Sequence, residues 1–283
     1  MLKLIKWTVI IALLAGTAAA SWYYFSEKES FPNILLLGAD EVEQNSRHSD
    51  TIMAAVIDVK AVKITLFSIP RDTLVNYGGR EMKINTIYAS VFIKNGHAAA
   101  ADEVRKEVER LTGLSIPYYF LVDYGAVEEM VDLFGGIKLD IKKNMNYTDV
   151  AGGLYIDFKP GIQKLDGKAA VKYLRFRSDP MADLGRIERQ QKFVAAFLDK
   201  AKTRLSLDKI PKVYSIIKRN LKTNVPVETV LRLYVAFKNY RLSDAWMLTL
   251  PGEPVSINGV SYWKTDARET RTALRKLKHL KEE

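Results

Sequence analysis

The sequence predicts one α/β domain, a mixed sheet with helices packed on both sides, preceded by a single transmembrane helix. Short apolar runs that end at Gly, Pro or polar loops are interspersed with longer segments of helical periodicity. This order is typical of a mixed sheet covered by helices. No Pro-rich or Ser-rich linker divides residues 31–283. The segment 7–25 carries no charge and has a length that can span a bilayer, for which roughly 17–25 residues are needed.

The uncharged segment 7–25 is the predicted membrane anchor. Lys3 and Lys6 precede it, so the positive-inside rule places the N-terminus in the cytoplasm and the remaining chain outside the cell. The aromatic cluster Trp22–Phe25 suits the outer membrane interface. A cleaved signal peptide is the alternative, because Ala18–Ser21 offers small residues for cleavage, and it also exports the domain.

The predicted organisation is that of a single-pass protein of the cell membrane with an extracellular domain. Its parts are a short cytoplasmic N-terminus, the anchor, a polar spacer and the exported domain, at residues 1–6, 7–25, 26–30 and 31–283.

Strands are predicted where apolar runs of strand length stop at Gly, Pro or polar residues. A loop at 39–49 follows the first strand, a tight turn at Lys60 and Ala61 separates the next two, and Pro70 ends the third because it has no N–H for the ladder. The predicted strands are Asn33–Leu37, Ile52–Val59, Val62–Ile69, Tyr118–Asp123, Ile137–Ile141, Ala245–Leu250 and Val260–Trp263. Residues 142–164, rich in Gly and Asn, are expected to be irregular.

Helices are predicted where apolar residues recur at helical spacing. Gly135 and Gly136 are expected to end one of them, since Gly is a common C-terminal stop. An extended segment, Arg175–Arg177, separates two others. The predicted helices are Ala98–Leu111, Tyr124–Phe134, Asp166–Leu174, Leu184–Lys202, Val227–Phe237 and Thr265–Leu280.

The composition excludes several kinds of chemistry. The chain has no cysteine, which excludes disulfides, thiolate metal sites and a cysteine nucleophile. Three histidines leave little room for a histidine-based triad or zinc site. No phosphate-binding loop or dinucleotide fingerprint occurs. The formal net charge of +10 favours anionic partners such as nucleic acid, anionic lipid or a phosphate-rich polymer.

Two aspartates flank the loop after the first predicted strand. Asp40 follows that strand and Asp50 precedes the second, so both carboxylates lie at one end of the sheet if the strands are neighbours. Mg²⁺ typically takes one or two carboxylates together with substrate phosphates. The alternative is that each aspartate caps a loop or turn, and spacing alone favours it.

Charged residues follow the third strand directly. Functional residues tend to lie in loops held by a rigid sheet. In Ser68–Thr73, Arg71 is therefore expected to bind a phosphate, and Asp72 is expected to orient Arg71 through a bidentate pair. Lys83 and Asn85, expected in the next loop, add a point charge and an amide. The alternative is a surface salt bridge.

The start of the longest predicted helix is rich in arginine. Asp183 precedes it, and Arg186, Arg189 and Gln190 share one face. Arg186 lies in the first turn, whose positive end favours anions.

Arg175 and Arg177 lie two residues apart and share a face if the segment is extended. Several arginines without matching acids repel one another unless an anion lies between them, and guanidinium groups match phosphate geometry. The chemistry indicated is transfer by positioning and charge neutralisation at a pyrophosphate. A solvated basic face is the alternative.

Eight short motifs occur in order along the exported segment. They are Asn33–Asp40 (NILLLGAD), Ser49–Met53 (SDTIM), Ser68–Thr73 (SIPRDT), Lys83–Asn85 (KIN), Asp132–Ile137 (DLFGGI), Leu165–Ala170 (LDGKAA), Tyr173–Arg177 (YLRFR) and Asp183–Gln191 (DLGRIERQQ). With them the chain resembles the LytR-CpsA-Psr (LCP) family, bacterial enzymes that ligate teichoic acids, capsule and related polymers to peptidoglycan. One departure is His48, with Arg47 before it, where the family usually has Arg next to the Ser-Asp-Thr motif.

The resemblance implies an LCP-type catalytic domain with a long apolar pocket for a polyprenyl tail. It implies that Asp40 and Asp50 help to hold Mg²⁺ at the pyrophosphate. The catalytic residues it implies are Asp40, Asp50, Arg71, Asp72 and Asp183. The pyrophosphate-binding residues it implies are Arg71, Lys83, Asn85, Arg175, Arg177, Arg186, Arg189 and Gln190.

The function expected from this resemblance is that of a Mg²⁺-dependent phosphotransferase. Its donor is a polyprenyl-pyrophosphate-linked glycopolymer and its acceptor is peptidoglycan. The alternative is a non-catalytic polyprenyl-phosphate-binding factor for envelope assembly or regulation. A nucleic-acid partner is not expected, because about six residues precede the anchor on the cytoplasmic side.

Overall fold

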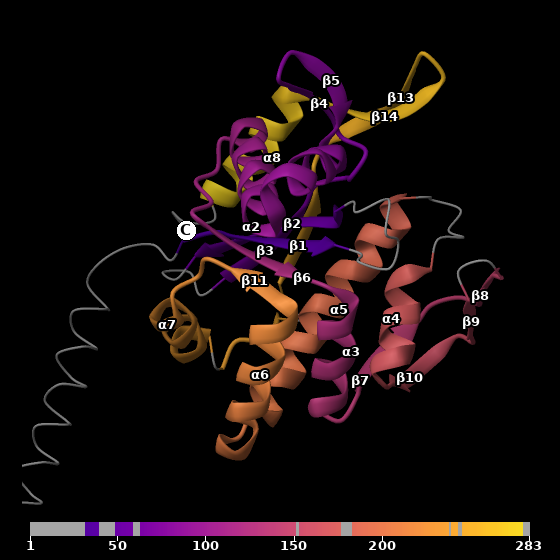
Figure 1. The fold of residues 1–283 in the computed structure, drawn as a ribbon, viewed down its shortest axis with the longest axis vertical. Coiled ribbons are helices and arrows are strands. Elements are labelled where there is room, and N and C mark those ends of the chain that lie inside the picture. Colours follow the sequence, from indigo (N-terminus) through magenta and orange to yellow (C-terminus); the bar gives the residue numbers. More distant parts are fainter. Residues whose placement is uncertain are drawn as a thin grey trace, which may run out of the picture.

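A mixed sheet of six strands forms the centre of the molecule. The computed structural model describes residues 32–39, 49–58, 63–150, 153–176, 183–237, 239–242 and 245–279. The strand order is β11-β6-β1-β2-β3-β12 (Figure 1). These strands are β1 (Ile34–Ala39), β2 (Ser49–Asp58), β3 (Lys63–Ser68), β6 (Tyr118–Val122), β11 (Leu221–Thr223) and β12 (Trp246–Thr249). β6 is parallel to β1 and β12 to β3, whereas the other neighbours are antiparallel. The predicted mixed sheet is confirmed.

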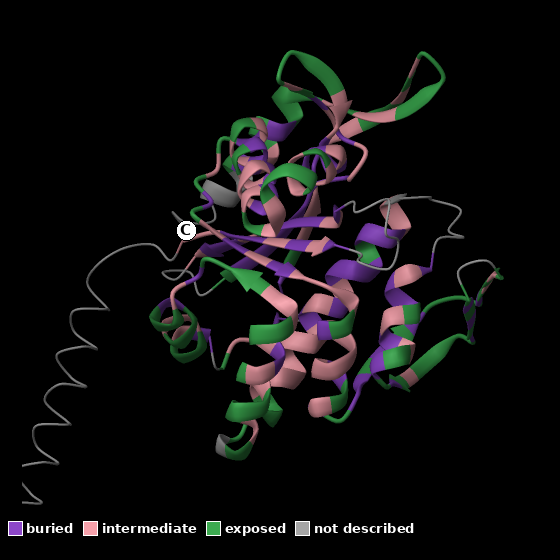
Figure 2. Ribbon diagram, viewed as in Figure 1, coloured by how far each residue is buried: buried purple, intermediate pink, exposed green. Residues whose placement is uncertain are grey.

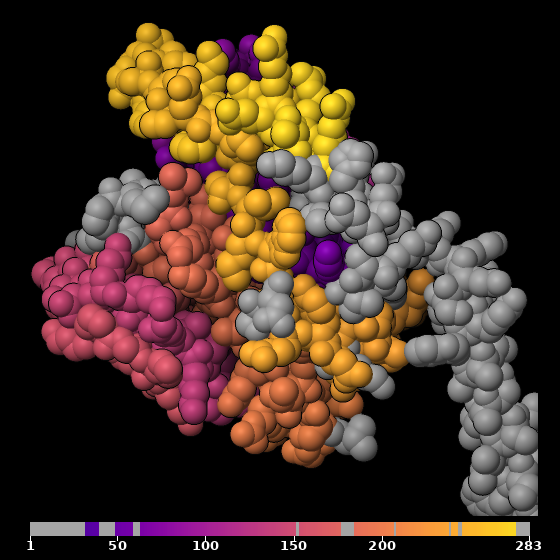
Figure 3. All heavy atoms as spheres, turned by 180° about the vertical axis from the view of Figure 1, so that it is seen from behind, coloured from indigo at the N-terminus to yellow at the C-terminus, as the bar shows by residue number. Residues whose placement is uncertain are grey.

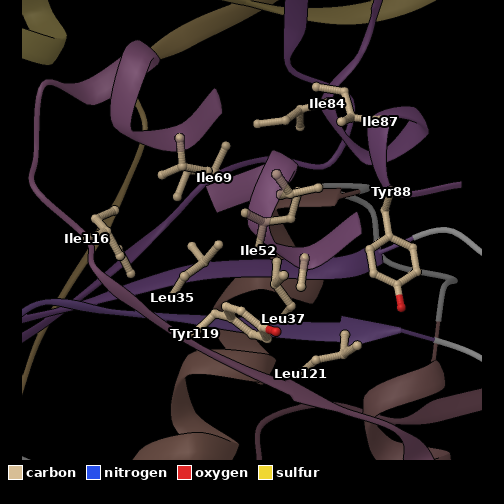
Figure 4. Packing of buried hydrophobic residues seen from close by; sticks show 14 of the residues in the cluster. Leu35, Leu37, Ile52, Ile69, Ile84, Ile87, Tyr88, Ile116, Tyr119 and Leu121 are labelled. Atoms are coloured by element: carbon tan, nitrogen blue, oxygen red, sulfur yellow. The ribbon is translucent and has the colours of Figure 1, made fainter. Parts of the chain in front are cut away.

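Helices cover both faces of this sheet, as the sequence predicts. α2 (Ile84–Thr112) and α8 (Ala267–His279) lie on one face, and α5 (Asp183–Arg204) and α7 (Val227–Phe237) lie on the other (Figure 1). Alternate residues of each strand supply the two faces. Leu35 and Leu37 join the cluster under α2, which Figure 4 shows from close by, and Ile34 joins the cluster under α5 and α7.

A third hydrophobic cluster lies beside the sheet. It is built by α3 (Tyr124–Leu133), α4 (Gly167–Arg175), β7 (Ile137–Ile141), β8 (Met145–Asp149), β9 (Leu154–Phe158), β10 (Gly161–Leu165) and part of α5. The prediction that residues 142–164 are irregular is wrong. β8 pairs with β9, and Leu154, Ile156 and Phe158 alternate with exposed residues, so a strand of period two is present in a segment rich in turn residues. The outlying hairpins are largely exposed, whereas the strands of the central sheet are largely buried (Figure 2).

The remaining elements are two hairpins and a helix. β4 (Leu74–Tyr77) pairs with β5 (Arg80–Lys83), and β13 (Gly252–Ile257) pairs with β14 (Val260–Thr265). A 3-10 turn, η1 (Leu207–Lys209), precedes α6 (Ile210–Asn220). Seen from behind, the C-terminal segment in yellow covers the upper part of the molecule (Figure 3).

Helix boundaries follow from capping residues and from glycine. The side chain of Asp123 accepts from Ala126 N at 2.6 Å at the start of α3, and Gly135 ends it with φ of 79°. α2 is longer than the predicted 98–111, because it begins at Ile84 and continues across a kink at Gly96, where φ is 77°.

The predicted anchor 7–25 and the turn at Lys60 and Ala61 lie outside the described residues. Among the residues that the structure does describe, no helix combines the length and apolar character needed to cross a membrane.

Candidate functional site

Asp50 is the extra residue of a β-bulge. Gly38 of β1 pairs with Thr51 and Ala39 pairs with Ser49, so Asp50, the second residue of β2, has no partner opposite it on β1. The sequence predicts Asp50 before a strand that begins at Ile52, whereas β2 begins at Ser49 and includes Asp50. A bulge bends the strand and re-aims the side chain at that position, and bulges are common next to active sites. The pairing also confirms that β1 and β2 are neighbours, with the end of β1 beside the start of β2.

Two arginines hold the Asp50 carboxylate. Arg71 Nη1 donates to Oδ1 at 2.7 Å, and Arg186 Nη2 lies 3.0 Å from Oδ2. The side chains of Asp50 and Arg186 are 9% and 4% exposed, and that of Arg71 is 27% exposed. Burial raises the pKa of Asp50, but the charges and hydrogen bonds of Arg186 and Arg71 outweigh it and hold the pKa below its ordinary value. The carboxyl is therefore ionised at neutral pH.

A tight turn after β3 presents Arg71. Thr73 donates from both N and Oγ1 to the carbonyl of Pro70, at 3.0 and 2.6 Å. The backbone N of Asn85 donates to Arg71 O at 3.2 Å, which ties this turn to the first turn of α2. Pro70 has no N–H for the ladder and so stops β3 at this position.

Gln191 fixes α5 to the sheet, a role the sequence analysis did not assign. Its buried amide Nε2 lies 2.9 Å from Ser68 Oγ, 2.9 Å from Leu248 O and 3.3 Å from Leu66 O. These contacts join α5 to β3 and β12 close to Arg186. The sequence signal that could have indicated this role is that Gln191 is the second Gln of a Gln-Gln pair in the arginine-rich first half of the helix.

Arg186 and Arg189 of α5 are buried, which excludes a solvated basic face at these two positions. Gln190 beside them is buried as well. Arg189 Nη2 donates to Phe176 O at 2.5 Å, and its guanidinium lies 5.2 Å from the centre of the Phe176 ring. Tyr173 is buried nearby, and burial raises its pKa to about 12.

Three expectations about the remaining residues are wrong. Arg175 is the last residue of α4 and not part of an extended segment, and its guanidinium lies 5.8 Å from the centre of the Tyr124 ring. Asp72 does not orient Arg71, because its ion pair is with Lys83, at 3.0 Å. Lys83 is the last residue of β5 and Asn85 lies in α2, so neither is in a loop.

The structure thus brings Asp50, Arg71 and Arg186 into direct contact and ties Asn85 to the same turn. Asp72 and Lys83 form a neighbouring pair on this turn and β5. Asp40, Arg177 and the side chain of Asp183 lie outside the described residues, so their part in the site stays a prediction.

Among the described residues, Asp50 offers carboxylate oxygens of the kind that Mg²⁺ prefers. Asp50 is an ionised carboxylate at the sheet end where the sequence predicts the metal. No group of three His, Cys, Asp or Glu side chains gathers anywhere in the part of the chain that is described. A Mg²⁺ site made of one or two carboxylates, with phosphates supplying other ligands, does not need such a group. The described residues supply one such carboxylate, Asp50, and the metal itself stays a prediction.

Comparisons with known proteins agree with the fold and the motifs. Residues 16–279 match the LytR_cpsA_psr family model. The polyisoprenyl-teichoic acid–peptidoglycan teichoic acid transferase TagU of Oceanobacillus iheyensis is 31% identical over 241 residues, which are 84% of this chain and 72% of TagU.

The regulatory protein MsrR of Staphylococcus aureus is 28% identical over 222 residues, or 77% of this chain, and the match spans 64% of MsrR, less than two thirds of its length. The solved structure of TagT bound to LIIa-WTA is similar with a TM-score of 0.72 at 26% identity, over 90% of this chain and 94% of that one.

Proposed function

The chain belongs to the LytR_cpsA_psr family, and from this premise we propose that it is a Mg²⁺-dependent phosphotransferase of the cell surface. It transfers a glycopolymer, such as teichoic acid or capsule, from a polyprenyl-pyrophosphate carrier to peptidoglycan. The observation that carries the proposal is the cluster of Arg71, Asp50 and Arg186, in which Asp50 forms an ion pair with each arginine. Two guanidinium groups, whose geometry matches phosphate oxygens, converge on one carboxylate at the end of the sheet.

Asp50 orients the two guanidinium groups before the substrate arrives. Its oxygens are each engaged by one arginine, and the bulge and the Pro70 turn fix where these side chains start. Guanidinium groups match phosphate oxygens in geometry, and groups that are already oriented stabilise developing charge without reorganisation. Arg71, the more exposed of the two, is the proposed direct contact to the pyrophosphate.

The reaction is a displacement at phosphorus. A sugar hydroxyl of peptidoglycan attacks the phosphorus on the polymer side, a new P–O bond forms, and the bond from that phosphorus to the bridging oxygen breaks. Polyprenyl phosphate leaves with the bridging oxygen and its electron pair, and a phosphodiester remains. The hydroxyl proton passes to a carboxylate, for which Asp40 and Asp183 are the proposed acceptors. Asp40 and Asp50 would hold Mg²⁺, which would neutralise pyrophosphate charge.

The apolar cluster under α2 supports a lipid-linked donor. Ile69 and Ile84 belong to this cluster; in the chain, Ile69 precedes the turn that carries Arg71, and Ile84 begins α2 next to Asn85. The apolar pocket for the polyprenyl tail that the family resemblance implies stays a prediction. A carrier of this kind lies in a membrane, which agrees with the predicted anchor at 7–25 and an extracellular domain.

Transfer in vitro tests the proposal. A short polyprenyl-pyrophosphate-linked saccharide and peptidoglycan oligomers are incubated with the chain, with Mg²⁺ or with EDTA. We expect a product that EDTA abolishes and that Arg71→Ala reduces by at least about 100-fold, the size of loss typical when one charge-stabilising donor is removed. Arg219→Ala, which breaks an exposed ion pair with Glu129 instead, is the matched control and keeps full activity.

A second candidate function is that of a non-catalytic polyprenyl-phosphate-binding factor, because the relative MsrR is named a regulatory protein. Binding of the donor lipid with no product from any acceptor, in the presence of Mg²⁺, would favour this candidate and refute the enzyme.

A further inference from the structure

α7 is apolar on nearly all sides, including the side that faces solvent. Its sequence, VETVLRLYVAF, contains only three polar residues, Glu228, Thr229 and Arg232. The exposed apolar residues, called here the α7 stripe, are Val227 (74% exposed), Val230 (43%), Leu231 (60%), Tyr234 (43%) and Val235 (42%). They recur at i, i+3, i+4, i+7 and i+8, which places them on one helical face.

The α7 stripe is not needed for the core. The opposite side of the helix, with Leu233, Ala236 and Phe237, already packs against the sheet in one cluster with Ile34 and Leu242. An exposed apolar face of several neighbouring large residues marks an interaction site more often than a chance feature of the surface.

The position of α7 indicates what covers the stripe. Ile34, where the chain enters the sheet, shares a cluster with Phe237, and Ile64 N, at the start of β3, donates to Tyr240 Oη at 3.4 Å. α7 therefore lies at the end of the sheet where β1 begins, at the edge of the molecule (Figure 1). The Asp50 and Arg71 site lies at the opposite end, where β1 and β3 finish.

The predicted anchor keeps this end of the sheet near the bilayer. Only residues 26–31 separate Phe25 from Pro32, and a chain of this length spans at most roughly 25 Å when fully extended. Trp246, 45% exposed, begins β12 at the same end, and Lys63 Nζ lies 5.9 Å from the centre of its ring. Trp and Tyr are enriched at membrane interfaces.

We propose that the α7 stripe lies in the interfacial layer of the outer membrane leaflet, as a second, non-spanning contact with lipid beside the anchor. The inference rests on the membrane location put forward under the proposed function. It goes further by naming the part of the domain that contacts the bilayer, the end of the sheet where β1 begins.

The absence of native cysteine allows a direct test in the full chain. Leu231→Cys and Ile162→Cys are each labelled with a nitroxide and reconstituted in vesicles of phosphatidylcholine and phosphatidylglycerol. Ile162 is the control because it is also an exposed aliphatic residue, 78% exposed, but lies on β10, away from α7 (Figure 1). Collision of each label with oxygen, which concentrates in lipid, is compared with collision with a water-soluble nickel chelate.

We expect the oxygen-to-nickel ratio at 231 to exceed that at 162 several-fold. Equal ratios would overturn the inference. A label at 231 that is shielded from both reagents, with spin–spin broadening that disappears on dilution with unlabelled chain, would show a second copy over the stripe and also overturn it. Flotation of the vesicles after an alkaline wash distinguishes failure of the membrane anchoring from failure of the α7 contact. A chain that the wash releases from the vesicles refutes the anchoring itself. A retained chain with a water-exposed label at 231 refutes only the α7 contact.

Discussion

Replacing Asp50 by Asn removes the charge that compensates two arginines. The amide keeps the size of the side chain but removes the negative charge that lies 3.0 Å from Arg186, whose side chain is 4% exposed. Removing one partner of a buried pair costs about 3–5 kcal/mol, mainly because the other charge stays buried. Arg71, 27% exposed, can regain water, so the lower figure of about 3 kcal/mol applies.

Thermal unfolding of the detergent-solubilised chain at pH 7 measures this cost. For a domain of this size each kcal/mol lowers Tm by about 2–4 °C, so Asp50→Asn should lower Tm by about 6–12 °C. The control is Asp157→Asn, because Asp157 pairs with Lys159 at 3.1 Å but both side chains are about two-thirds exposed. Such a pair contributes less than about 1 kcal/mol, and its Tm should shift by less than about 4 °C.

A double variant isolates the cause. If the stranded charge of Arg186 is the main cost, Asp50→Asn combined with Arg186→Met should recover at least half of the lost Tm. Equal Tm shifts for Asp50→Asn and Asp157→Asn, or no recovery in the double variant, would refute the reasoning.

Three further outcomes are expected. The pKa of Asp50 is lower in the folded chain than the unfolded value of about 3.9. Its contribution to stability is therefore present above about pH 4 and is lost as the pH falls through the folded-state pKa. The Tm difference between wild type and Asp50→Asn should narrow below pH 4, and a constant difference would contradict this assignment. Gln191→Met should cost about 1–3 kcal/mol in thermal unfolding, because the buried Ser68 Oγ and Leu66 O lose their side-chain donor. Gly167→Ala should also cost about 1–3 kcal/mol, because its Cβ would lie 2.3 Å from the backbone oxygen of Glu128 and force α3 and α4 apart; an unchanged Tm would show that the two helices separate freely.

Local patterns in the sequence were sufficient for most of the central sheet. β1 reads ILLLGA, an apolar run that ends near polar residues, and it is buried on both sides as such a run predicts. The helix at 124–134 and its Gly-Gly stop were equally visible, because capping is decided by neighbours in the chain. The β8–β9 hairpin was missed because its Gly and Asn residues hid an alternation of period two.

The partners within the site were not predictable from spacing. Asp72 is adjacent to Arg71 but pairs with Lys83, while Arg71 reaches Asp50, 21 residues away. These choices depend on strand order, on the bulge and on where Gln191 holds α5, and none of these leaves a local pattern. Burial of Arg186 was likewise hidden, because an arginine at a helix start normally lies in water.

The order of the strands also protects the chain against aggregation. Unpaired strand edges offer a template on which other copies can add, and long apolar edges are the most hazardous. Here the ten-residue β2 and the apolar β1 are interior strands, whereas the edge positions belong to β11 with three residues and β12 with four. β11 also carries an exposed lysine, Lys222, which discourages pairing with a neighbour. The segments of highest β-propensity are thus the ones a folded copy never presents to another.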